Sequence, residues 1–391
     1  MNSQSVRYVL SAAAMIVCVA SGTARAQVPA DIEAGLLKIG KIVDPACTAK
    51  LYRPLMPAND VNSKVTPLYP GITIAREVSF GPDAKDVVDI FAADKGGGSR
   101  PVLIYVPGGA GNKIEQQSVE ANAFYDNIMR WATKNGMVGV QMQRHPGQGN
   151  WDDGGKDVSR MIQWLQDNIA KYKGNPDRML IWAHSAGNGP LGTYIGRPEL
   201  YGPKGVGVKG AIFMSGQFNI APVQVQGAGG TGRAGVPGAA AAPGGPGAAG
   251  SACGIDAAVA LGGPGTARGA PGGAGRAGGA GGPGGAAAGA GGRGGRGQVD
   301  PETQLARSSL PELKKTKVAI MLATAELDPG IDGSMSAFNQ TLHDELCKEG
   351  SAHCPAMLFA KGESHMSEVF SIDTKDTIVS GPILAWIKKV K

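Results

Sequence analysis

The feature that most constrains the fold is a short apolar run that leads directly into a serine flanked by small residues. Residues 178–182 read Arg-Met-Leu-Ile-Trp, and the sequence Ala-His-Ser-Ala-Gly follows at once, with Ser185 at its centre. A strand can turn sharply into a helix with a serine at the apex only if the residues two before and two after it are small, because the backbones crowd together there. Ala183 and Gly187 meet that demand, although glycine is usual at the first of these positions. The segment therefore predicts a nucleophile elbow.

Apolar runs with the length and composition of strands recur along the chain, and helical patterns separate them. Most of these runs are continuously apolar, which is typical of strands covered on both faces. Val158, Met161 and Leu165 recur at helical spacing, and Gly-Asn-Pro at 174–176 is expected to end that helix. The pattern predicts an α/β fold with a doubly wound, mainly parallel sheet, in which the first two strands form an antiparallel pair. The expected strands are 73–80, 87–92, 102–106, 137–142, 179–182, 210–214, 318–323 and 357–360.

The first residues have the layout of a secretory signal peptide. Arg7 precedes a short apolar run, and small residues lead up to Ala26. Residues 1–26 are therefore expected to be removed. No apolar run approaches the roughly 20 residues needed to span a bilayer, so we expect a secreted or periplasmic protein without stable membrane insertion.

Residues 226–298 form a low-complexity segment of glycine, alanine and proline with almost no bulky apolar side chains. Such a composition cannot bury enough surface to offset chain entropy, so we expect a disordered insert between two parts of one domain, 27–225 and 299–391. Five arginines against one aspartate give this segment +4 of the net charge of +6. The arginines are sparse and no aromatic residues are interleaved with them, so a nucleic-acid partner is not expected.

Four cysteines remain after the signal peptide. Cys347 and Cys354 are close enough in sequence to close a small disulfide loop in an oxidising compartment, whereas Cys47 and Cys253 are left open between a disulfide and free thiols. The chain contains no C-x-x-C motif and no histidine-rich cluster, so neither a metal site nor a cofactor is expected. The oligomeric state cannot be inferred from the sequence.

A turn of small residues, Pro-Gly-Gly-Ala at 107–110, directly follows the strand expected at 102–106. Backbone N–H groups of Gly109 and Ala110, together with that of Ala186, are candidates to bind a developing oxyanion. Taken alone, the turn is better explained as an ordinary strand-to-loop connection. Its position upstream of the serine elbow favours an oxyanion hole.

A serine hydroxyl is a weak nucleophile and needs a base, which in turn needs an orienting acid. Of the five histidines, His365 lies after the last expected strand and before the last helix, whereas His184 is too close in sequence to turn back on Ser185. Asp328 begins the loop after the strand expected at 318–323 and is the preferred acid. Two further carboxylates, Glu326 and Asp332, are alternatives.

The order Ser185, Asp328, His365 is that of α/β-hydrolases. From about residue 73 to the end, without the insert, the chain resembles exported α/β-hydrolases of the carboxylesterase and lipase type, related to the hormone-sensitive-lipase esterases. The oxyanion turn of these proteins usually reads His-Gly-Gly, and here Pro107 stands in place of the histidine. In this resemblance, the insert occupies the position of a lid.

The resemblance implies a serine hydrolase that cleaves small-molecule carboxylic esters through an acyl-enzyme. Short or small acyl groups are favoured, because the expected lid has little apolar surface. A long-chain lipase and a serine peptidase of the same fold remain alternatives, and no sequence feature separates a peptidase from an esterase. A further alternative is a non-catalytic surface protein that keeps a hydrolase scaffold and interacts through its insert, since a fold alone does not determine function.

Overall fold

The structure is a computed structural model. The signal peptide expected at 1–26, the insert at 226–298 and the oxyanion residue Ala110 lie outside the residues that it describes. The described residues are 28–56, 69–109, 123–145, 150–223 and 299–390.

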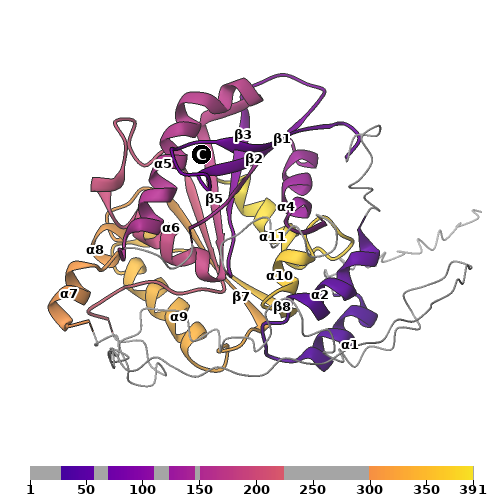
Figure 1. Cartoon of the computed structure of the whole chain (residues 1–391). Helices are drawn as coiled ribbons and strands as arrows, with labels where there is room; N and C mark the ends of the chain where they lie inside the picture. Colours follow the sequence, from indigo (N-terminus) through magenta and orange to yellow (C-terminus); the bar gives the residue numbers. More distant parts are fainter. Residues whose placement is uncertain (1–27, 57–68, 110–122, 146–149, 224–298, 391) are drawn as a thin grey trace, which may run out of the picture.

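An eight-stranded sheet runs through the centre of the molecule (Figure 1). Strand β1 pairs antiparallel with β2, β2 pairs antiparallel with β4, and all other neighbours are parallel. The predicted mainly parallel sheet and its leading antiparallel pair are confirmed. In sheet order the strands are β1 (Ile72–Ser79), β2 (Val87–Ala93), β4 (Val138–Met142), β3 (Arg100–Val106), β5 (Gly174–His184), β6 (Gly210–Met214), β7 (Ala319–Leu327) and β8 (Ala356–Ser364).

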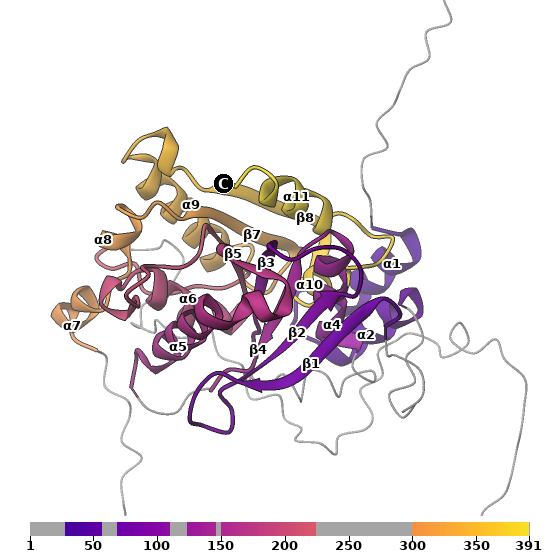
Figure 2. The ribbon, with the colours of Figure 1, turned by 90° about the horizontal axis from the view of Figure 1, so that it is seen from above.

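Helices cover both faces of the sheet, as the continuous apolar strands predict (Figures 1 and 2). Side chains along β5 alternate between two cores: Ile181 and Ala183 belong to one, and Trp182 belongs to the other. The first core is completed by α5 (Asp153–Asn168), α6 (Asn188–Ile195), α8 (Leu310–Leu313) and α9 (Ser334–Cys347). The second is completed by α1 (Ala30–Ile39), α2 (Pro45–Tyr52), α4 (Ala123–Lys134), α10 (Ser367–Phe370) and α11 (Ser380–Ile387).

Three strands extend four or more residues beyond the apolar runs that predict them. Strand β5 begins at Gly174 rather than 179, and β7 and β8 continue to Leu327 and Ser364. The additional residues are mostly polar or small. In β7 and β8 the ladder continues past the apolar side chains, because it needs only N–H and C=O groups, whereas in β5 only Gly174 of the added N-terminal residues pairs with β3. Leu327 still pairs with Ser364 beyond an irregularity in the ladder. The extended ends of β7 and β8 carry the chain toward the candidate site.

The two chain segments that flank the insert lie against each other. The carbonyl of Asn219 accepts a hydrogen bond from the Ser309 N–H at 2.9 Å, and the Asn219 side chain donates to the carbonyl of Gln304 at 2.7 Å. Gln304 lies in α7 (Pro301–Ala306), whose first turn is capped by Asp300. Both ends of the insert are therefore anchored to the same part of the core.

A disulfide joins Cys347, at the end of α9, to Cys354, just before β8. The predicted pairing of these two cysteines is thus present. The pairing of Cys47 with Cys253 cannot be described, because Cys253 lies outside the described residues.

Among the helices that the structure describes, none is both long enough and apolar enough to cross a membrane.

Candidate active site

The turn between β5 and α6 places Ser185 in a left-handed backbone conformation, with φ of +52°. Residues other than glycine adopt this conformation rarely, at a cost on the order of 1–3 kcal/mol. The neighbouring small residues explain how the turn closes, since a Cβ at Gly187 would lie 2.5 Å from the carbonyl oxygen of Val106. The methyl group of Ala183 is fully buried within the sheet core, so alanine is accommodated where the usual pattern has glycine.

The buried side chain of Asn188 ties this turn to β6. Its Nδ2 atom donates hydrogen bonds to the carbonyl oxygens of Ser185 and Met214, both at 2.8 Å. Gly216 leaves room for this contact, because a Cβ there would lie 2.3 Å from the Ser185 carbonyl oxygen. The strained serine is therefore held from its carbonyl side.

The structure brings Ser185, His365 and Asp328 into one hydrogen-bonded chain. The His365 Nε2 atom lies 2.8 Å from Ser185 Oγ, and its Nδ1 atom lies 2.8 Å from Asp328 Oδ2. Asp328 and His365 are buried, whereas Ser185 is half-buried. In this geometry an imidazole can take a proton from the serine while a buried carboxylate holds its other nitrogen.

The two alternative acids are engaged elsewhere. Glu326 accepts a hydrogen bond from the Gly362 N–H at 2.7 Å. Asp332 is exposed and forms an ion pair with Lys41. Neither contact involves His365, which leaves Asp328 as the acid that the geometry favours.

The loop that carries His365 is held by two serines on either side of it. The Ser364 N–H donates to Ser367 Oγ at 2.6 Å, and the Ser367 N–H donates to Ser364 Oγ at 3.3 Å. The second of these bonds satisfies the first N–H group of α10, which has no partner within the helix. His365 is thereby fixed between the end of β8 and the start of α10.

The turn at 107–109, which is expected to contribute to the oxyanion hole, lies directly against the serine. A Cβ at Gly108 would lie 2.6 Å from Ser185 Cβ, so this position accepts only glycine without rearrangement. Gly109 is exposed and has φ of +55°, which favours glycine. Ala186 begins the turn after the serine and is half-buried. Gly108 is thus packed against the serine and Ala186 follows it directly in the chain, whereas Ala110 is outside the described residues.

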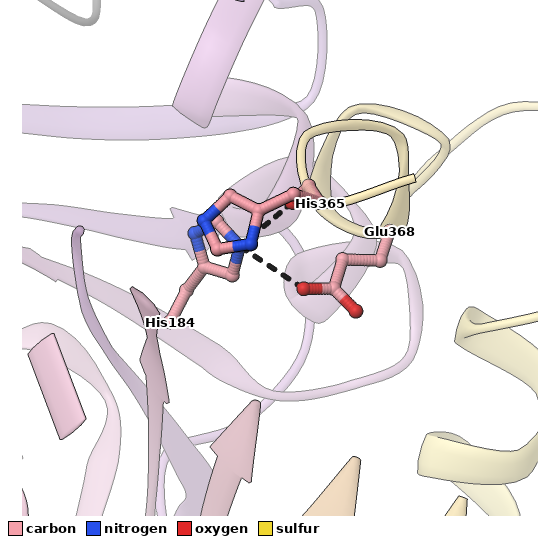
Figure 3. Close-up of side chains that lie close together, drawn as sticks. All are labelled: His184, His365 and Glu368. Atoms are coloured by element: carbon pink, nitrogen blue, oxygen red, sulfur yellow. Dashed lines mark hydrogen bonds and ion pairs between the residues drawn. The ribbon is translucent and has the colours of Figure 1, made fainter. Parts of the chain in front are cut away.

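Behind His365 lies a second buried pair, His184 and Glu368 (Figure 3). The His184 Nε2 atom lies 2.8 Å from the His365 carbonyl oxygen and 3.1 Å from Glu368 Oε1. Because a carbonyl oxygen can only accept, Nε2 must carry the ring hydrogen. Burial and the neighbouring His365 ring lower the pKa of His184, while burial and the charge of Asp328 raise the pKa of Glu368. His184 thus supports the backbone of His365 rather than contacting the adjacent serine hydroxyl.

Sequence reasoning missed Glu368 and Arg144, both of which contact the site. Glu368 follows His365 by three residues, and Arg144 lies two residues after the strand expected to end at 142. This closeness in sequence to the candidate histidine and to a strand end is the signal that could have marked them as site residues.

Among the described residues, two groups have donor atoms close enough for a metal ion. These are His184, His365 and Glu368, and, separately, Asp86, His145 and Asp157. In the second group both carboxylates already pair with Arg160.

The mainly parallel sheet and the Ser-Asp-His order are those of the α/β-hydrolase fold. Comparison with known families agrees, since residues 88–196 match the BD-FAE family. The matched segment begins in β2 and ends directly after α6, so it contains the elbow and the oxyanion turn. It does not reach Asp328 or His365.

Two curated relatives are from Mycobacterium tuberculosis. The probable carboxylic ester hydrolase LipM is 34% identical over 94 residues, which cover 23% of this chain and 20% of LipM. Esterase LipQ is 33% identical over 116 residues, covering 28% of this chain and 26% of LipQ. The chain thus spans about a quarter or less of the length of these relatives. The solved structure of a bifunctional GH43-CE protein of Bacteroides eggerthii is 13% identical in sequence and superposes with a TM-score of 0.50. The superposition covers 81% of this chain and 38% of that chain, and it supports the fold.

Proposed function

We propose that this chain is a serine hydrolase that cleaves carboxylic esters through an acyl-enzyme. The observation that carries the proposal is the continuous hydrogen-bonded chain from Ser185 through His365 to Asp328, with both distances at 2.8 Å. The names of LipM and LipQ, a carboxylic ester hydrolase and an esterase, support the same reaction class.

In the first half of the proposed reaction, Ser185 Oγ attacks the acyl carbon of the ester. The hydroxyl proton passes to Nε2 of His365, and Asp328 stabilises the imidazolium through Nδ1. The carbonyl oxygen becomes an oxyanion, which the N–H groups of Gly109, Ala110 and Ala186 bind. Collapse of this intermediate breaks the ester C–O bond. The alcohol leaves with the proton from His365, and the acyl group remains on the serine.

In the second half, water takes the place of the alcohol. His365 accepts a proton from the water as its oxygen attacks the acyl carbon, and a second oxyanion forms in the same hole. When this intermediate collapses, His365 returns the proton to Ser185 Oγ. The acid product leaves and the starting arrangement is restored, so no cofactor is consumed.

We propose further that the substrates are small esters with short acyl groups and that the protein is exported. The acyl preference rests on the apolar-poor composition of residues 226–298. Export rests on the signal-like residues 1–26, and the disulfide between Cys347 and Cys354 is compatible with an oxidising compartment.

A fluorophosphonate probe and a ladder of p-nitrophenyl esters, from acetate to palmitate, test these proposals. We expect covalent labelling and turnover that is greatest for the short esters, and both should disappear in Ser185→Ala. Ser351→Ala removes an exposed serine and is the matched control. Labelling that persists in Ser185→Ala, or an absence of turnover along the whole ladder, would refute the proposed chemistry.

The same assays separate the alternative functions. Turnover that rises toward palmitate would indicate a long-chain lipase, and cleavage of peptide p-nitroanilides in preference to esters would indicate a peptidase. Deletion of residues 226–298 addresses the interaction-protein alternative. Retained esterase activity, with loss of cell-surface binding, would identify the insert as an attached interaction module.

A further inference from the structure

The buried side chain of Arg144 binds the carbonyl oxygens of the turn proposed to form the oxyanion hole. Arg144 follows β4, and its strand lies parallel to β3, so the side chain reaches the turn that follows β3. Its Nε atom donates to the carbonyl oxygen of Pro107 at 2.6 Å, and its Nη2 atom donates to the carbonyl oxygens of Gly109 at 3.0 Å and Gly108 at 3.3 Å. One guanidinium thus binds three consecutive carbonyl groups.

These contacts determine which way the opposite side of the turn points. In a trans peptide the C=O and N–H groups lie on opposite sides of one rigid plane. The Gly108 carbonyl shares its plane with the N–H of Gly109, which is one of the N–H groups proposed to bind the oxyanion. A side chain that holds this carbonyl therefore also directs the Gly109 N–H away from itself.

The turn needs such support because its own residues supply little stiffness. Gly108 cannot carry a side chain, since it lies against Ser185, and Gly109 is in the left-handed region. Glycine has the greatest backbone freedom of any residue, so an unsupported Gly-Gly turn would sample many orientations of its N–H groups. Pro107 has no N–H of its own to anchor the turn, and its carbonyl is bound by Arg144 instead.

The charge of Arg144 adds to this effect. The side chain is buried, and in the part of the chain that the structure describes no carboxylate lies within ion-pair distance of it. Burial lowers the pKa of Arg144 to about 10, which still leaves the guanidinium charged at neutral pH. A positive charge on the far side of the peptide planes favours negative charge on the near side.

We propose that Arg144 is the positioning residue of the oxyanion hole, an inference that rests on the proposed ester hydrolysis at Ser185. It touches no reacting atom and acts through the peptide groups of Gly108 and Gly109. A planar fork is needed to reach three carbonyls at once, so lysine, with a single nitrogen, can replace the charge but not the geometry.

The test uses the full-length protein with Arg144→Met and Arg144→Lys, and with Arg178→Met as a matched control at an exposed position on β5. We measure kcat and KM for p-nitrophenyl acetate and the inhibition constant of a trifluoromethyl ketone, which forms a tetrahedral oxyanion with the serine. Circular dichroism and thermal unfolding monitor folding. We expect Arg144→Met to lose about 100-fold or more in kcat with little change in KM, and to weaken ketone binding in parallel.

Arg144→Lys should lose about tenfold or more in kcat and also weaken ketone binding, and it decides the question if Arg144→Met does not fold. Folded variants with kcat within about threefold of the wild type, or a loss of kcat without weaker ketone binding, would overturn the inference. Failure of the proposed function is distinguishable, because the wild-type protein would then turn over no ester and label with no fluorophosphonate.

Discussion

The close contact between the oxyanion turn and the elbow makes Gly108→Ala a sharp probe of the site. A Cβ at Gly108 would lie 2.6 Å from Ser185 Cβ and 3.0 Å from the carbonyl oxygen of His184. Ordinary van der Waals contact begins at 3.4 Å, so the turn and the serine must separate by the difference between 3.4 and 2.6 Å, about 0.8 Å. Neither neighbour is the free end of a flexible side chain, and the backbone must therefore move.

A displacement of this size should affect both catalysis and folding. Misplacement by about 1 Å can lower a rate by about 100-fold, so we expect a decrease of that order in kcat for p-nitrophenyl acetate. Overpacking should lower the free energy of unfolding by about 1–3 kcal/mol, measured by urea denaturation. KM should change little, because the turn contacts the oxygen most strongly in the tetrahedral intermediate.

Gly189→Ala is the matched control. A Cβ at this position in α6 meets no atom within 4 Å, so the variant should keep wild-type kcat and gain up to about 1 kcal/mol in stability. If Gly108→Ala folds and keeps kcat within about threefold of the wild type, the turn does not contribute to the reaction in the manner proposed.

Three further perturbations test the surroundings of the site. Asn188→Ala removes both buried amide hydrogen bonds between the elbow and β6, and should lower the free energy of unfolding by about 2–4 kcal/mol in urea; a loss below about 1 kcal/mol would contradict their assigned role. The lowered pKa of His184 means that the unfolded chain binds its proton first, so stability should fall as the pH drops below about 6.5, and His184→Gln should reduce that slope; an unchanged slope would refute the assignment. Reduction of the disulfide between Cys347 and Cys354, which are seven residues apart, should lower thermal stability by about 2 kcal/mol, whereas an unchanged melting temperature would argue against any stabilising role.

The mainly parallel sheet and its leading antiparallel pair could be predicted from the sequence, because continuous apolar runs mark strands that are buried on both faces, but the order of the strands in the sheet could not. The elbow at Ser185 and the choice of His365 and Asp328 rested on local signals, a small-residue turn and polar residues directly after strands. The structure brings these three side chains together although 180 residues separate Ser185 from His365.

The contacts of Arg144 and Glu368 could not be predicted in the same way. Arg144 binds backbone carbonyls 35 to 37 residues away, and a carbonyl group has no residue-specific signal in the sequence. Glu368 is a buried acid on a short helix, where composition alone indicates an exposed surface residue. Strand ends were misjudged for a related reason, since ladder pairing depends on backbone groups rather than on apolar side chains.

The hydrogen bonds of Asn219 to Ser309 and Gln304 bear on how the length of the segment 224–298 can vary in evolution. They join the described residues on either side of the segment 224–298. For any flexible loop between such ends, the entropy of closure grows only logarithmically, so shortening from about 75 residues to about 10 would alter stability by about 2 kcal/mol. Lineages can therefore lengthen, shorten or replace this segment with little thermodynamic penalty, and an engineer could graft a foreign peptide or domain there.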